Sequence, residues 1–162
     1  MQQKTTLSKS AQNPRFVADV HLGRLALYLR MLGFDTRYGN DFRDEELGAD
    51  VIRQRRILLS RDRQLVQRAG PEVGYLVREQ DPGKQLAEVC ARFDLKGRAR
   101  PFSLCLRCNR LVVAVDKKDI EARLEPDTRK RFHRFFMCTK CGRIYWAGSH
   151  YERMKRFIER YL

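Results

Sequence analysis

The amino-acid sequence predicts an α/β fold, in which helices flank a parallel sheet, followed by a smaller unit organised by cysteines. Two observations support this prediction. Short apolar segments alternate with helical patterns over residues 15–93, and strands that alternate with helices pair in parallel through right-handed crossovers. Beyond that region two Cys-x-x-Cys pairs replace the alternation, so the 162 residues form one main core and a small appendage.

The alternation begins with a strand over 15–20, which is apolar and rich in β-forming residues. A helix follows directly, because leucines recur at helical spacing at Leu22, Leu25, Leu29 and Leu32. After a second strand over 34–38, acidic residues at 41–46 predict the start of a helix that runs to about residue 55, since helix dipoles favour acids there. The remaining pattern predicts strands at 56–60 and 72–77 and helices at 62–69 and 83–93.

Gly97 and Pro101 interrupt this pattern and predict a domain boundary. We therefore divide the chain into a flexible polar tail over 1–13, a main domain over 14–98 and a second unit over 102–162. The second unit ends in an amphipathic helix over about 150–162, which places its large apolar residues on one side.

The formal net charge of +14 favours a polyanionic partner, because each phosphate that a protein neutralises releases condensed counterions. Nucleic acid is the leading candidate, and the alternative is that the basic residues only solvate helix faces. No apolar run is long enough to span a bilayer, and the polar start does not resemble a signal peptide. We predict a cytoplasmic protein, in which paired cysteines indicate a metal site rather than a disulfide.

The two cysteine pairs have the spacing of a structural zinc site. In each pair a tight turn directs two thiolates at one tetrahedral ion, so the predicted ligands are Cys105, Cys108, Cys138 and Cys141. Four protein ligands leave no open position for water, which makes the zinc structural rather than catalytic. The stretch between the pairs is longer than in the commonest ribbons and predicts an insertion with helical pieces over 117–136.

Three aspartates, Asp19, Asp44 and Asp62, are predicted to lie at strand ends or at the start of the intervening helix. Open α/β sheets assemble their sites at the carboxyl ends of strands, so these side chains are candidates for a Mg²⁺ or Mn²⁺ site that serves phosphodiester hydrolysis. Glu45 and Glu46 lie beside Asp44. Each aspartate also has an ordinary explanation as a helix N-cap, and spacing alone does not choose between the two interpretations.

Several sequence landmarks occur in order along the chain: FVADVHLGRLALYLRMLGFDT, DEEL, ILLSRDRQL, CLRCN and FFMCTKCGRIYWAGSH. Together they resemble the PIN-like ribonuclease domains found at the C-terminus of the Mut-seven exonucleases and as small standalone prokaryotic proteins. The resemblance implies a PIN-like α/β nuclease domain joined to a zinc ribbon. It also implies metal-binding acids at Asp19, Asp44 and Asp62, with Glu45 or Glu46 able to substitute; candidates for a fourth acid are Asp41 and Asp81.

The preferred function is a metal-dependent ribonuclease acting on single-stranded RNA, in which Arg61 and Arg63 flank Asp62 and contact phosphates. The alternative is a non-catalytic RNA-binding or ribosome-associated module. For such a module, the contact surface is the basic cluster of Arg129, Lys130, Arg131 and Arg134. A third interpretation, a toxin or regulator that meets a protein partner, has no positive support in the sequence.

Overall fold

The computed structural model describes residues 12–38, 51 and 53–161, so most of the predicted tail and the predicted acidic helix start lie outside the described residues. Its first part is a parallel sheet in the order β2-β1-β3-β4. The strands are β1 (Phe16–Ala18), β2 (Thr36–Tyr38), β3 (Ile57–Ser60) and β4 (Gly74–Leu76). The predicted α/β fold class is therefore confirmed.

Helices cover both faces of this sheet, because side chains alternate between the faces along each strand. Phe16 and Ala18 of β1 belong to the larger core, under the two helices α1 (Gly23–Met31) and α4 (Pro82–Phe93). Val17, between them, belongs to a smaller core with Leu65 of α3 (Arg63–Ala69). Two short 3-10 helices complete this part, η1 (Val20–Leu22) and η2 (Lys96–Arg98).

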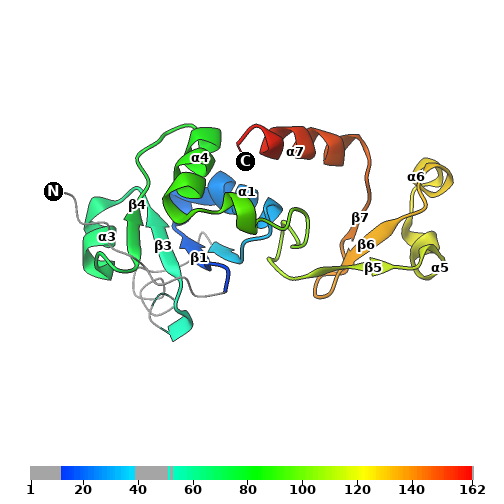
Figure 1. The fold of residues 1–162 in the computed structure, drawn as a ribbon. Helices are drawn as coiled ribbons and strands as arrows, with labels where there is room; N and C mark the ends of the chain where they lie inside the picture. Colours follow the sequence, from blue (N-terminus) through cyan, green and yellow to red (C-terminus); the bar gives the residue numbers. More distant parts are fainter. Residues whose placement is uncertain (1–11, 39–50, 52, 162) are drawn as a thin grey trace.

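The final helix, α7 (Ser149–Glu159), returns to the same face of the sheet as α1 and α4 (Figure 1). Ile158 is buried in the larger core, and the ring of Phe157 lies 4.3 Å from that of Tyr28 on α1. The Tyr161 ring covers Gly83 at the start of α4, where an added Cβ would collide with its hydroxyl oxygen. The predicted domain boundaries stay a prediction, but this helix of the second unit packs against the first.

The second unit is an antiparallel sheet in the order β5-β6-β7, formed by β5 (Val112–Val115), β6 (Phe135–Cys138) and β7 (Ile144–Tyr145). The predicted insertion is present as α5 (Lys117–Ile120), η3 (Glu121–Arg123) and α6 (Pro126–Arg131). The second unit without α7 is called the ribbon below. Figure 1 shows it extending away from the α/β sheet, with α5 and α6 at its far tip. Along the described parts of the chain, no helix has both the length and the apolar character to cross a membrane.

Polar contacts fix the start of the ribbon to the edge of the α/β sheet. The guanidinium of Arg30, which is 8% exposed, donates to the carbonyls of Leu106 and Arg107 at 3.0 and 3.1 Å, and to that of Thr36 at 2.9 Å. Asn109 accepts a hydrogen bond from the backbone N–H of Thr36 at 3.1 Å and donates to Asp35 at 2.6 Å. These contacts join the first cysteine pair to β2 and α1.

Asp35 is the anionic centre of this junction. Burial raises the pKa of its carboxyl, but hydrogen bonds from Arg56 and Asn109 and the nearby charges of Arg56 and Arg15 outweigh burial, so the pKa lies below its ordinary value of 3.8. A lowered pKa in the folded state stabilises the ionised form. The contribution of Asp35 to folding is thus complete at neutral pH and is lost as the pH falls below the ordinary carboxyl range.

Asn109→Gly is expected to lower the free energy of unfolding by about 1–3 kcal/mol, because the buried N–H of Thr36 loses its acceptor. Glycine keeps the backbone relaxed, since Asn109 has a φ of 59°. Thermal or urea denaturation measures the change. The control Gly142→Asn occupies the corresponding position of the second pair, with a φ of 66° and no contact to the junction, and is expected to be nearly neutral. Equal destabilisation by the two variants would contradict a role for the junction.

Candidate functional site

Four cysteine sulfurs from two separate turns gather at one end of the ribbon. The Sγ atoms of Cys105, Cys108, Cys138 and Cys141 all lie within 4.8 Å of one another. Cys105 and Cys141 are separated by 3.7 Å and Cys108 and Cys138 by 3.3 Å. A tetrahedral zinc ion with Zn–S bonds of about 2.3 Å spaces its sulfurs by about 3.8 Å. The cluster is consistent with one structural Zn²⁺.

Both turns have the backbone of a zinc-binding knuckle. The N–H groups of Lys140 and Cys141 each lie 3.4 Å from Cys138 Sγ, where they favour a negative sulfur. The residue after each pair, Asn109 or Gly142, has a positive φ of 59° or 66°, which lets the chain reverse. Asparagine and glycine are the residue types that adopt this conformation most readily. This explains why Asn109 and Gly142 follow the second cysteine of each pair.

The surroundings of the thiols favour charge on two of them. Burial opposes ionisation of Cys105, but hydrogen bonds with Tyr145, at 3.0 Å, and with backbone N–H groups lower its pKa to about 6. For Cys138, burial is likewise outweighed by the N–H groups of Cys141 and Lys140, and its pKa is lowered. Burial and the neighbouring sulfurs raise the pKa of Cys108 to about 12. A bound dication would offset this rise in the pKa of Cys108, because a metal deprotonates its thiol ligands.

The fifth cysteine, Cys90, takes no part in the cluster. It lies on the buried side of α4 and is 6% exposed, and burial raises the pKa of its thiol to about 11. It is a neutral core residue.

Asp19 lies at the carboxyl end of β1, the strand between β2 and β3, and is 3% exposed. Its carboxylate accepts a hydrogen bond from the N–H of His21 at 2.9 Å, which caps η1, and a second from the hydroxyl of Ser60. The sequence interpretation of Asp19 as an N-cap therefore holds. Burial of a charged carboxylate is costly without such partners, so the two donors keep it in place.

Ser60 links Asp19 to the next strand. The register pairs Ala18 with Leu59, which brings the ends of β1 and β3 side by side. The Ser60 hydroxyl donates to Asp19 and accepts the backbone N–H of Asp62 at 2.8 Å. The Asp62 carboxylate in turn caps α3, accepting from the N–H groups of Gln64 and Leu65 at 2.7 and 3.2 Å. Asp19 and Asp62 thus share one edge of the sheet.

This acidic edge (Asp19, Ser60 and Asp62) lies where the chain changes direction across the sheet. β2 lies on one side of β1 and β3 on the other, and open α/β sheets place their sites at such a reversal of strand order, outside the carboxyl ends of the strands. Asp44 and Glu45, the other predicted catalytic acids, follow β2 and lie outside the described residues. Within the described residues the cysteines form the one group of three or more potential metal ligands.

The comparison with known families bears on this arrangement. The family described as Mut7-C RNAse domain matches residues 14–158, which include the α/β sheet, the cysteine cluster and nearly all of α7. The chain belongs to the Mut7-C RNAse domain family. Membership implies a nuclease with an RNA substrate. No curated protein and no solved structure matches the chain.

The structure places the predicted RNA-binding residues of this Mut7-C RNAse domain in two regions. Arg61 and Arg63 are exposed on either side of Asp62, at the acidic edge. The other predicted residues, Arg129, Lys130, Arg131 and Arg134, are exposed in and after α6 at the far tip of the ribbon (Figure 1). The two groups do not come together. Sequence reasoning missed Ser60, whose only signal was its position at the end of the strand ILLS.

Ser60→Ala is expected to reduce cleavage about 10–100-fold, the usual cost of losing a residue that orients a metal ligand. The side chain has 0% exposure, and its removal leaves the N–H of Asp62 without its acceptor, at a cost of about 1–3 kcal/mol in stability. The rate as a function of Mn²⁺ concentration separates the two effects. A positioning role predicts a weaker apparent metal affinity, whereas a purely structural role predicts an unchanged metal dependence.

Proposed function

We propose that the protein is a divalent-metal-dependent ribonuclease that hydrolyses phosphodiester bonds of single-stranded RNA at the acidic edge. The observation that carries this proposal is the buried carboxylate of Asp19, linked through Ser60 to the backbone of Asp62 at adjacent strand ends. In a chain of net charge +14, such a placement of acids is unusual and favours a cation site facing a phosphate-rich substrate.

The residues we assign to Mg²⁺ or Mn²⁺ are Asp19 and Asp62, with Asp44 or Glu45 as the third acid. Oxygen ligands of this kind suit hard divalent ions. When bound, such an ion polarises a phosphoryl oxygen and lowers the pKa of water. The Asp62 carboxylate uses one oxygen for capping α3; its other oxygen accepts no hydrogen bond from the described residues. Arg61 and Arg63, which flank it, are exposed and suited to hold the phosphates of the strand.

A second candidate function is a non-catalytic RNA-binding or ribosome-associated module. The observation that favours it is the exposed basic cluster around α6, which lies at the tip of the ribbon, away from the acidic edge (Figure 1). Contacts of this kind need no divalent ion, and they weaken steeply with salt.

The test compares cleavage of an end-labelled single-stranded RNA by wild type, Asp62→Asn and Asp94→Asn, each with and without Mn²⁺. Asparagine caps helices as well as aspartate, so Asp62→Asn retains α3 while losing the charge. Asp94 is an exposed residue at the end of α4 with a φ of 50°, which asparagine tolerates. We expect Mn²⁺-dependent cleavage by wild type and Asp94→Asn, and a loss of at least about tenfold in Asp62→Asn. Equal cleavage by the two variants, or none by wild type, would contradict the proposal.

A further inference from the structure

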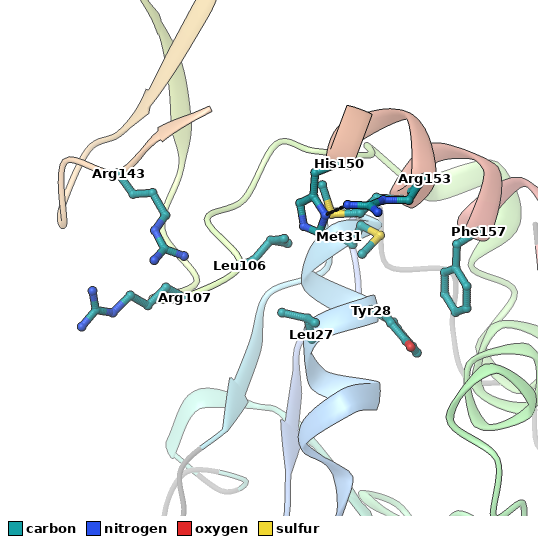
Figure 2. A pocket seen from close by; sticks show the side chains of 10 residues that line it. Leu27, Tyr28, Met31, Leu106, Arg107, Arg143, His150, Arg153 and Phe157 are labelled. Atoms are coloured by element: carbon teal, nitrogen blue, oxygen red, sulfur yellow. Dashed lines mark hydrogen bonds between the residues drawn. The ribbon is translucent and has the colours of Figure 1, made fainter. Parts of the chain in front are cut away.

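A hollow of 680 Å³ lies where α1, α7 and the first cysteine pair meet (Figure 2). Its apolar wall comes from Leu27 and Met31 on α1, Leu106 between the first two cysteines, and Phe157 on α7. Volumes of this order are typical of sites that hold small organic groups. The hollow is large enough for an unpaired nucleobase.

Three arginines and a histidine border this apolar wall. Arg107 and Arg143 lie on the ribbon side of the hollow, and His150 and Arg153 lie on the α7 side (Figure 2). Arg153 Nη2 is 3.5 Å from His150 Nδ1. All four residues are exposed, and no carboxylate lines the hollow among the described residues. An apolar wall with a basic rim complements a base and its phosphates.

The basic surface continues along α7. A second, smaller hollow of 350 Å³ is lined by Arg153, Arg156, Phe157 and Arg160, so it shares Arg153 and Phe157 with the first. The three arginines stand at i, i+3 and i+7, which places them on one face of the helix. The two acids of α7, Glu152 and Glu159, line neither hollow.

α7 runs from the ribbon toward the acidic edge. Its first turn lies over the end of α1, where His150 and Met31 line the same hollow. Phe157 packs on Tyr28 one turn earlier in α1, and Tyr161 packs on Gly83 at the start of α4. α4 follows β4, so its start lies on the side of the sheet where the parallel strands end. The arginines therefore lead toward the side that carries Asp19 and Asp62.

We propose that this surface, the α7 track (Arg107, Arg143, His150, Arg153, Arg156 and Arg160 with the apolar wall), binds single-stranded RNA outside the cleavage site. The phosphates lie along the arginines, and one unpaired base occupies the 680 Å³ hollow. The track leads the strand from the ribbon to the acidic edge. The inference rests on the proposed function in one respect, that the bound strand is the substrate.

The test is binding of a fluorescein-labelled single-stranded RNA, followed by anisotropy over a range of salt concentrations without added Mg²⁺ or Mn²⁺. The triple variant Arg153→Gln, Arg156→Gln, Arg160→Gln is compared with a control triple that removes the same charge, Lys96→Gln, Lys118→Gln, Lys155→Gln. The three lysines are exposed and line neither hollow, and Lys155 lies on α7 itself. Comparing the arginine triple with the lysine triple separates the loss of a local RNA contact from the general effect of a lower net charge.

We expect the arginine triple to weaken binding about tenfold or more and to flatten the slope of log K against log salt by about 2, since each phosphate contact contributes about 0.7. The lysine triple is expected to retain the slope. Equal effects of the two triples, or absence of RNA binding by wild type, would contradict the proposal that the α7 track binds RNA. If the surface instead binds an acidic protein or a second copy of the chain, wild type is expected to show no binding of RNA.

A photocrosslink tests the base-binding part without any substitution. RNA carrying 4-thiouridine is expected to crosslink to the peptides of 27–31 or 150–157, and a duplex of the same sequence is expected to bind less well, because its bases are not free to enter the hollow. Crosslinks confined to the ribbon tip would place the strand elsewhere. Loss of cleavage with these binding results intact would disprove the proposed function and leave the track standing, whereas cleavage with unaltered binding by the arginine triple would disprove the track alone.

Discussion

Asp19→Asn is expected to reduce Mn²⁺-dependent RNA cleavage by more than about 100-fold, beyond the roughly 10–100-fold cost of losing a residue that only supports a metal ligand. The substitution keeps the size of the side chain and removes its charge from a position that is 3% exposed. The measurement is the initial rate of cleavage of a labelled single-stranded RNA at saturating Mn²⁺.

The folded state should tolerate this change at a cost of about 1 kcal/mol. The carbonyl oxygen of the introduced asparagine still accepts one of the two hydrogen bonds made by Asp19, and the Ser60 hydroxyl is free to rotate and accept from the amide. Melting temperature and zinc content provide the controls. Cleavage that survives with the protein folded would remove Asp19 from catalysis and leave the non-catalytic RNA-binding alternative.

Cys138→Ser is expected to detach the zinc ion and loosen the ribbon. Structural zinc contributes about 10–16 kcal/mol of apparent binding free energy in small metal-dependent domains, so one of four ligands accounts for about 3–4 kcal/mol, or a few hundredfold in zinc affinity. Release of zinc from purified protein to a chromogenic chelator, and hydrogen exchange of the amides over 105–145, measure the effect.

The fifth cysteine supplies a matched control for this experiment. Cys90→Ala removes a thiol from the core of α4, which lies outside the cluster, and should leave one zinc per chain while costing only the stability of a small cavity. A wild-type protein without zinc, or a Cys138→Ser variant that holds zinc as tightly as wild type, would contradict a four-cysteine site.

The α/β fold was predictable from the sequence because its information is local. The alternation of short apolar runs with leucine-rich helical spacing identifies β1 and α1, and parallel pairing follows from the order of the elements. The cysteine spacing likewise predicted the cluster, since each knuckle is a local turn. The insertion between the pairs followed from the length of that stretch, and its helical pieces followed from the local pattern over 117–136.

Contacts between residues distant in the sequence were not predictable. The sequence predicts only that Ser60 ends a strand. Its hydrogen bond to Asp19, 41 positions away, depends on the register of β1 and β3. Asn109 reads as a turn residue of the knuckle, yet its side chain bonds to Thr36 and Asp35, 73 and 74 positions away. The amphipathic pattern of α7 predicted a buried face but not its partner, which is α1.

The return of α7 to the sheet couples the completion of the core to residues that follow the ribbon in the sequence. Tyr28 and Gly83 are covered by Phe157 and Tyr161, so these apolar surfaces remain wet on a growing polypeptide until residues beyond 150 leave the ribosome. Contacts that join such remote positions delay folding, because the closure entropy is lost before they form. The α/β core is therefore completed only after the intervening residues of the ribbon have been synthesised, well after its own strands have emerged.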